Sequence, residues 1–154
     1  MTISPDLDPL GDWRFELCPV SVAAEIVASK GALLILRECF YGTSRFSDFA
    51  LRTGMSDAVV AKRPLALLAA GVLERQLYVE PGRRGRLEYL LTERGRSFFP
   101  VLVALIHWGG AQIQQDNGRV RLSEGFNGTR VHVDVLGSTD RKLAPEEVAV
   151  SPRH

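Results

Sequence analysis

Residues 45–92 constrain the fold of this chain more than any other stretch. They read RFSDFALRTGMSDAVVAKRPLALLAAGVLERQLYVEPGRRGRLEYLLT. Apolar spacing predicts a short helix over residues 45–52, a turn at Thr53-Gly54 and a second helix that opens at Ser56. LERQLYVE and RLEYLL then alternate apolar and polar residues on either side of PGRRG. This alternation predicts a two-stranded ribbon with a basic tip.

The flanking segments complete the predicted order of elements. A helix is expected from Pro19 to about Lys30, a break at Gly31, and then a helix that is apolar on nearly all sides over residues 32–41. Thr92 is a good N-cap for a long helix over residues 93–115. That helix is more apolar than a surface helix, which favours a role in pairing two subunits.

After residue 116 the sequence indicates short strands at 119–124 and 129–136 and a helical turn at 145–148. The expected fold class is α+β and mostly helical. It is a winged helix-turn-helix with a long C-terminal dimerisation helix and a small β-containing C-terminal appendage. The expected domains are an N-terminal arm at 1–17, a winged-helix domain with the dimerisation helix at 18–115, and an appendage or tail at 116–154.

The positive charge of the chain is concentrated in the predicted helix-turn-helix and ribbon. Residues 1–44 carry a net charge of −3, residues 45–96 carry +4, and residues 97–154 balance. A basic surface of this kind is needed for contacts with phosphates. There is no apolar run near the length of a membrane span and no signal-peptide pattern, so a cytoplasmic protein without a membrane partner is expected. Two cysteines are too few for a disulfide framework.

Several short motifs, in order and at matching spacing, resemble the HxlR-type winged-helix regulators, which are related to MarR. They are CPV at 18–20, LLILRE at 33–38, RFSDF at 45–49, GMS at 54–56, LLAAGVLER at 67–75, EYLLTERG at 88–95, and PVL with HWG within 100–109. The resemblance covers about residues 18–110. It implies a cytoplasmic homodimer that binds palindromic double-stranded DNA and pairs through its long C-terminal helix. Some members of that family sense electrophiles or oxidants through the cysteine that matches Cys18, which makes Cys18 the candidate sensor.

On this fold the second helix would enter the major groove. Asp57, Ala58, Ala61 and Lys62 would face base edges in its first turns, and Ser56, Lys62 and Arg63 would reach phosphates. Arg83, Arg84 and Arg86 at the ribbon tip would reach the flanking backbone or the minor groove. The first hypothesis is therefore a homodimeric transcriptional regulator that responds to a small ligand or an oxidant.

Four residues depart from the family pattern that the chain resembles. Pro64 stands at a core leucine position, where a proline costs about 3 kcal/mol and should kink or break the helix near Lys62–Arg63. Leu65 and Ala66 stand at positions that are often basic. Gly31 stands where a tryptophan is usual, which leaves space to be filled. The ribbon tip is also longer, with an additional arginine.

These departures support a second hypothesis, in which DNA binding is lost and an apolar pocket binds a small molecule or acts on it as an enzyme. Gly31, Phe40, Tyr41, His107 and Trp108 are its candidate lining. An enzyme is the less favoured outcome, because no Ser–His–Asp arrangement, phosphate loop or metal-ligand spacing is present. No catalytic residue, metal or cofactor is therefore assigned. A third hypothesis is a protein–protein module that pairs with a true regulator.

Overall fold

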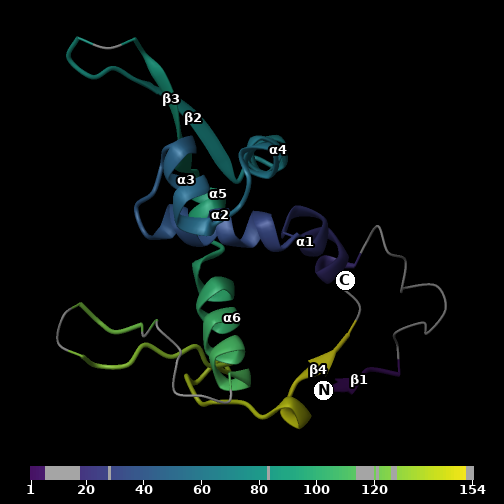
Figure 1. The fold of residues 1–154 in the computed structure, drawn as a ribbon. Helices are drawn as coiled ribbons and strands as arrows, with labels where there is room; N and C mark the ends of the chain where they lie inside the picture. The colour runs from purple at the N-terminus through teal and green to yellow at the C-terminus, as the bar shows by residue number, and fades with distance from the viewer. Residues whose placement is uncertain are drawn as a thin grey trace. The chain divides into compact units, whose positions relative to one another are not determined.

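The computed structural model describes residues 1–5, 18–27, 29–82, 84–113, 120, 122–125 and 128–151. Figure 1 shows the elements within them. In chain order they are β1 (Thr2–Ile3), α1 (Pro19–Val27), α2 (Lys30–Phe40), α3 (Phe46–Thr53), α4 (Asp57–Ala69), β2 (Leu73–Tyr78), β3 (Arg86–Leu91), α5 (Glu93–Arg96), α6 (Phe99–Gln112), η2 (Pro145–Glu147) and β4 (Ala149–Val150).

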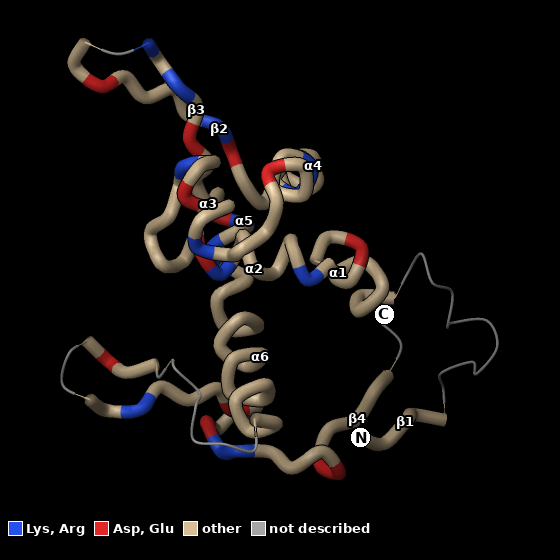
Figure 2. Tube along the Cα trace, in the orientation of Figure 1, with Lys and Arg blue, Asp and Glu red and all other residues tan. Residues whose placement is uncertain are grey.

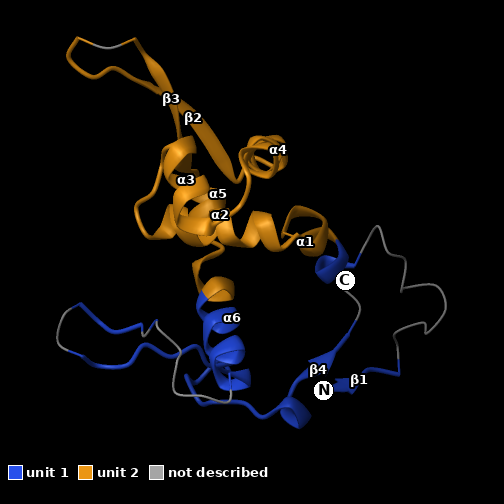
Figure 3. Cartoon of the chain, in the orientation of Figure 1, with its two compact units in different colours: residues 1–21, 103–154 blue, residues 22–102 orange. Residues whose placement is uncertain are grey.

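The chain divides into two compact units, shown in Figure 3. One unit comprises residues 22–102, and the other comprises residues 1–21 with 103–154. The predicted division into an arm, a winged-helix domain and a tail follows other boundaries and stays a prediction. No single helix in the described part of the chain is long and apolar enough to cross a membrane, although α1 and α2 pass that test as a bent pair.

The break between the first two helices lies earlier than predicted. α2 begins at Lys30, so Gly31 lies inside its first turn and does not end a helix. Ser29 is the N-cap, and its side-chain oxygen accepts a hydrogen bond from the Ala32 amide at 3.1 Å. The capping serine therefore determines where α2 starts, because it satisfies an amide that has no partner within the helix.

The predicted helix-turn-helix is confirmed. α3 ends at Gly54, which adopts the left-handed conformation with φ +67° and donates its amide to the Ala50 carbonyl at 3.0 Å. Ser56 occupies the N-cap position of α4, but its side chain makes no capping hydrogen bond. A continuous core joins α2, α3, α4 and the start of the ribbon. It consists of Ala32, Ile35, Leu36, Phe49, Val60, Leu67, Val72 and Leu73.

Pro64 does not break α4, which runs as one helix from Asp57 to Ala69. The prolyl ring is fully buried, beside Val60 and Leu67 on the core-facing side of the helix. Proline still lacks the amide that would bond the Val60 carbonyl. Tertiary packing therefore holds the helix together across a residue that disfavours it, which a propensity argument does not capture.

The ribbon forms as predicted, with β2 and β3 antiparallel and in register from Leu73↔Leu91 to Tyr78↔Arg86. The middle of β3 is tied to the segment before α3 by a bridge between Arg45 and Glu88. The Tyr89 amide also donates to the Ser44 carbonyl at 2.8 Å. The ribbon is therefore anchored to the helix-turn-helix along β3.

The single helix predicted over residues 93–115 is wrong, because two helices occupy this segment. α5 is capped by Thr92, whose side-chain oxygen accepts from the Gly95 amide at 3.0 Å, and it ends at Arg96. α6 then starts at Phe99 with Pro100 in its first turn. Proline has no amide to bond the Arg96 carbonyl, and its ring clashes with that carbonyl in a continuous helix. The chain must therefore restart the helix here.

In the second unit, β1 and β4 pair in parallel, so the first residues of the chain pair with residues near its end. The strands predicted at 119–124 and 129–136 are wrong within the described residues. Only the isolated bridges Ser123↔Arg130 and Leu136↔Lys142 form there, although backbone hydrogen bonds join the two segments beside each bridge, for example from the Glu124 amide to the Thr129 carbonyl at 2.8 Å. The predicted helical turn is confirmed as η2, closed by a hydrogen bond from the Ala144 amide to Glu147 at 2.8 Å.

Candidate nucleic-acid interface

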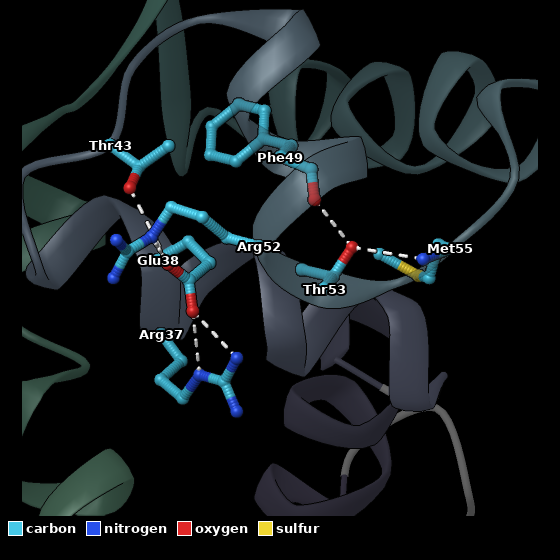
Figure 4. A network of polar contacts seen from close by, with 7 residues as sticks. All are labelled: Arg37, Glu38, Thr43, Phe49, Arg52, Thr53 and Met55. Atoms are coloured by element: carbon cyan, nitrogen blue, oxygen red, sulfur yellow. Dashed lines mark hydrogen bonds and ion pairs between the residues drawn. The ribbon is translucent and has the colours of Figure 1, made fainter.

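A buried carboxylate holds the first helix of the helix-turn-helix in place. Glu38 of α2 is only 2% exposed. It forms ion pairs with Arg37, at 2.6 Å, and with Arg52 of α3. The Thr43 hydroxyl donates at 3.4 Å to Oε2 of Glu38, the oxygen that also pairs with Arg52. Figure 4 shows the Glu38 carboxylate between the two guanidinium groups.

The pKa of Glu38 reflects this arrangement. Burial raises the pKa of the carboxyl, but hydrogen bonds from Arg52 and Arg37 and their positive charges outweigh burial and lower the pKa below its ordinary value of 4.5. Glu38 is therefore ionised at neutral pH and links α2 to α3. This role of Glu38 was not predicted from the sequence, although a charged pair inside an otherwise apolar run is a signal for it.

The turn after α3 is held by its own polar contacts. The Thr53 hydroxyl donates to the Phe49 carbonyl at 2.5 Å and accepts from the Met55 amide at 3.4 Å (Figure 4). Phe49 is fully buried in the core. The start of α4 is therefore positioned by α3, which in turn is positioned by Glu38.

The structure leaves the predicted reading residues of α4 accessible. Val60, Pro64 and Leu67 face the core. The predicted reading residues are all exposed; they are Ser56, Asp57, Ala58, Ala61, Lys62 and Arg63. Helical spacing places Ala58 and Lys62 opposite the buried side.

Arg63 lies against α2, at the residue that was predicted to leave open space. A Cβ atom on Gly31 would lie 3.1 Å from Cγ of Arg63 and 3.3 Å from the sulfur of Met55. The side chains of Arg63 and Met55 therefore occupy the space next to Gly31. The absence of a side chain at residue 31 lets the arginine stem pack on the helix backbone.

The ribbon presents basic side chains beyond the point where β3 is anchored. Arg84 and Arg86 are exposed, and Figure 2 shows the basic positions along β3 and toward the tip. Arg83 lies outside the described residues. Arg45 differs from these two arginines, because its guanidinium lies 4.6 Å from the Tyr78 ring centroid and pairs with Glu80 at 2.9 Å.

The predicted pocket residues lie in two units and are described separately. In residues 22–102, Phe40 packs against Phe99 with ring centroids 5.5 Å apart, and Tyr41 lies beneath the guanidinium of Arg37. An open hollow of about 470 Å³ lies beside Tyr41. In the other unit, the His107 ring lies 6.2 Å from that of His132. Trp108 is 69% exposed. A ligand pocket formed by these residues stays a prediction.

The two cysteines differ in their surroundings. Burial, together with the negative charge of Glu38, raises the pKa of Cys39 to about 12. That thiol therefore does not ionise near neutral pH, and Cys39 packs against the apolar core. Cys18 lies immediately before α1 and is partly exposed. Its predicted sensor role is not tested by this geometry.

Comparisons with known proteins agree on one family. A family model described as HxlR-like helix-turn-helix matches residues 26–117. The HTH-type transcriptional regulator Mb3122 of Mycobacterium bovis is 36% identical over 105 residues, which are 68% of this chain and 65% of that protein. This chain therefore spans slightly less than two thirds of the length of that relative.

Two solved structures extend the similarity beyond the family segment. A crystal structure of PA1607, described as a transcription factor, has a TM-score of 0.78 and 32% identity and covers 88% of this chain and 95% of its own. A second such structure, PA1374 from Pseudomonas aeruginosa, has a TM-score of 0.64 and 29% identity over 88% of this chain and 92% of its own. The family model spans the core helices, the helix-turn-helix and the ribbon, and this chain belongs to the HxlR-like helix-turn-helix family.

Proposed function

We propose that this chain is a DNA-binding transcriptional regulator that acts as a homodimer. One observation carries the proposal: α4 turns an exposed face away from the core, and the ribbon next to it extends exposed Arg84 and Arg86. A helix of this kind fits the major groove, and the basic ribbon fits the flanking phosphates. The net charge of +4 over residues 45–96 agrees with this.

The exposed surface of α6 supports the homodimer. Val101, Leu105 and Trp108 are exposed and follow one another at i, i+4 and i+7, so they share one side of the helix. An apolar helix side of this size is usually covered by a partner. A two-fold dimer through α6 would present two α4 helices to half-sites about 34 Å apart, one DNA turn.

A response to a small ligand or to oxidation is the regulatory part of the proposal. Cys39 is unsuited to thiol chemistry because its pKa is raised to about 12. Cys18 is therefore the thiol to which an oxidant response is assigned. The alternative, a pocket beside Gly31 in place of DNA binding, has less support, because Arg63 and Met55 occupy the space next to that glycine.

The salt dependence of DNA binding tests the proposal. The probe is a duplex from the region upstream of the chain's own coding sequence, titrated at several salt concentrations beside a random duplex. The slope of log K against log salt is negative, and each lost phosphate contact makes it less steep by about 0.9. In a dimer, the R84A/R86A variant should therefore make the slope less steep by about 3 to 4.

R94A is the control for loss of charge, because it removes one positive charge per protomer, against two in R84A/R86A, from α5 and not from the ribbon. It should leave the slope unchanged. An equal decrease in both variants would contradict the assignment of the ribbon to DNA. Wild-type protein that binds neither duplex at low salt would contradict the proposed function as a whole.

A further inference from the structure

The outer side of α4 is almost entirely apolar. The exposed residues on the side opposite the buried Val60, Pro64 and Leu67 are Ala58, Lys62, Leu65, Ala66 and Ala69, with Val59 and Ala61 at the two edges of that side. Lys62 is the one charged residue among them. In Figure 2, α4 is accordingly drawn mostly in tan, the colour of uncharged residues.

This helix also has few groups that could form hydrogen bonds with base edges. From Asp57 to Ala69 it contains no Asn, Gln, Ser or Thr. Its single arginine, Arg63, packs its stem on the backbone of α2 at Gly31. Paired hydrogen bonds to guanine normally come from Arg or Lys, and those to adenine from Asn or Gln. On the outer face of α4, Lys62 is the one side chain that could form them.

The same side chains suit another feature of the major groove. Thymine carries a 5-methyl group there, which apolar side chains contact. Ala58, Ala61 and Leu65 follow one another at i, i+3 and i+7, so they form one strip along the helix. Leu65 is 49% exposed and reaches furthest from the helix axis, whereas the alanines allow the helix to approach the base edges closely.

We infer that α4 reads DNA chiefly through thymine methyl groups, with Ala58, Ala61 and Leu65 as the residues that determine specificity. The favoured ligand is duplex DNA whose half-sites present thymines in the major groove to this strip. The inference rests on the proposed function. Lys62 on the same side and Arg84 on the ribbon favour DNA as the occupant, because an apolar protein partner would have to desolvate Lys62.

Replacing thymine by deoxyuridine removes the methyl group and keeps every base-pairing atom. Duplexes that bind the wild-type dimer are first selected from a random pool and then resynthesised with deoxyuridine in the half-sites. Each contacted thymine that is replaced should weaken binding about fourfold, which corresponds to about 0.8 kcal/mol for one buried methyl-sized group. Deoxyuridine placed only outside the half-sites should leave affinity unchanged, which controls for altered DNA shape.

The L65A variant links this effect to α4. It should bind the thymine duplex more weakly than the wild type does. When deoxyuridine replaces thymine, the affinity of L65A should also fall by about fourfold less than that of the wild type, because one methyl contact is then already absent. L51A is the matched control, since Leu51 on α3 is 83% exposed and undergoes the same substitution. It should keep the full penalty.

The outcomes separate this inference from the function on which it rests. If the wild-type protein binds thymine and deoxyuridine duplexes equally, thymine readout is overturned, whereas the salt dependence still supports a DNA-binding regulator. An L65A variant that keeps the same penalty as L51A also overturns the role of the strip. If no duplex is selected from the pool at low salt, both the inference and the proposed function are overturned.

Discussion

The two helices of the helix-turn-helix pack on the same core by different means. α3 contributes Phe49 to the core and is also held by the ion pair from Arg52 to the buried Glu38. α4 contributes Val60 and Leu67, and in the described part of the chain no ion pair joins it to a neighbouring element. α3 is thus fixed by directional charge contacts, whereas α4 is fixed by apolar packing alone.

This difference separates positioning from recognition. A buried ion pair works only in one geometry, so it determines where α3 lies and, through the turn at Gly54, where α4 begins. The apolar contacts of α4 with the core are made by its inner side, so they do not restrict which residues lie on its outer side. The residues that would contact DNA can therefore change without loss of the fold.

The largest expected effect comes from removing the buried charge that holds α3. E38Q removes the negative charge and leaves Arg37 and Arg52 without their partner. Breaking a buried pair by removing one member costs about 3–5 kcal/mol. Because both arginines are partly exposed, we expect the free energy of unfolding in urea to fall by the lower end of this range, about 3 kcal/mol.

E74Q, on the exposed side of β2, is the control and should change the free energy of unfolding by less than about 0.5 kcal/mol. Equal losses in both variants would show that Glu38 does not anchor α3.

The same pair predicts a dependence of stability on pH. The folded-state pKa of Glu38 lies below its ordinary value of 4.5, so its contribution is complete above that pH and is lost as pH falls through the folded-state pKa. Wild-type stability should therefore decrease more steeply below pH 4.5 than that of E38Q. Parallel curves of unfolding free energy against pH for the two proteins would contradict a lowered pKa.

The smallest expected effect tests the apolar side of the comparison. P64A restores an amide for the Val60 carbonyl and removes a cost of about 3 kcal/mol from the helix. The variant also loses two buried ring carbons, Cγ and Cδ, at about 0.8 kcal/mol each. The net gain should be about 1 kcal/mol, which raises Tm by about 2–4 °C for a chain of this length.

P100A is the control for this substitution, because Pro100 lies in the first turn of α6, where proline is tolerated. Its Tm should change by less than that of P64A. A clear decrease in Tm for P64A would mean that core packing of the prolyl ring stabilises the protein by more than the missing hydrogen bond destabilises it.

Much of the fold could be predicted from local patterns. The spacing of apolar residues and the residues Gly54, Ser56 and Thr92 located α3, α4, the ribbon and the start of α5, because caps and periodicity act over a few residues. The break before α6 was missed, although Pro100 was a signal for it. The predicted DNA-contacting residues of α4 are exposed, but the direction of Arg63 depends on a glycine on another helix.

By itself, then, the sequence determined the helix-turn-helix, the basic ribbon and the family. Those features depend on residues close together in the chain. Only the tertiary structure decided that Glu38 is buried between two arginines, that α4 continues through Pro64, and that Arg63 packs beside Gly31. Each of these depends on contacts between elements far apart in sequence, whose packing energy outweighs local preference. The apolar outer side of α4 is likewise a property of the folded helix, because burial of Val60 and Leu67 decides which residues remain for DNA.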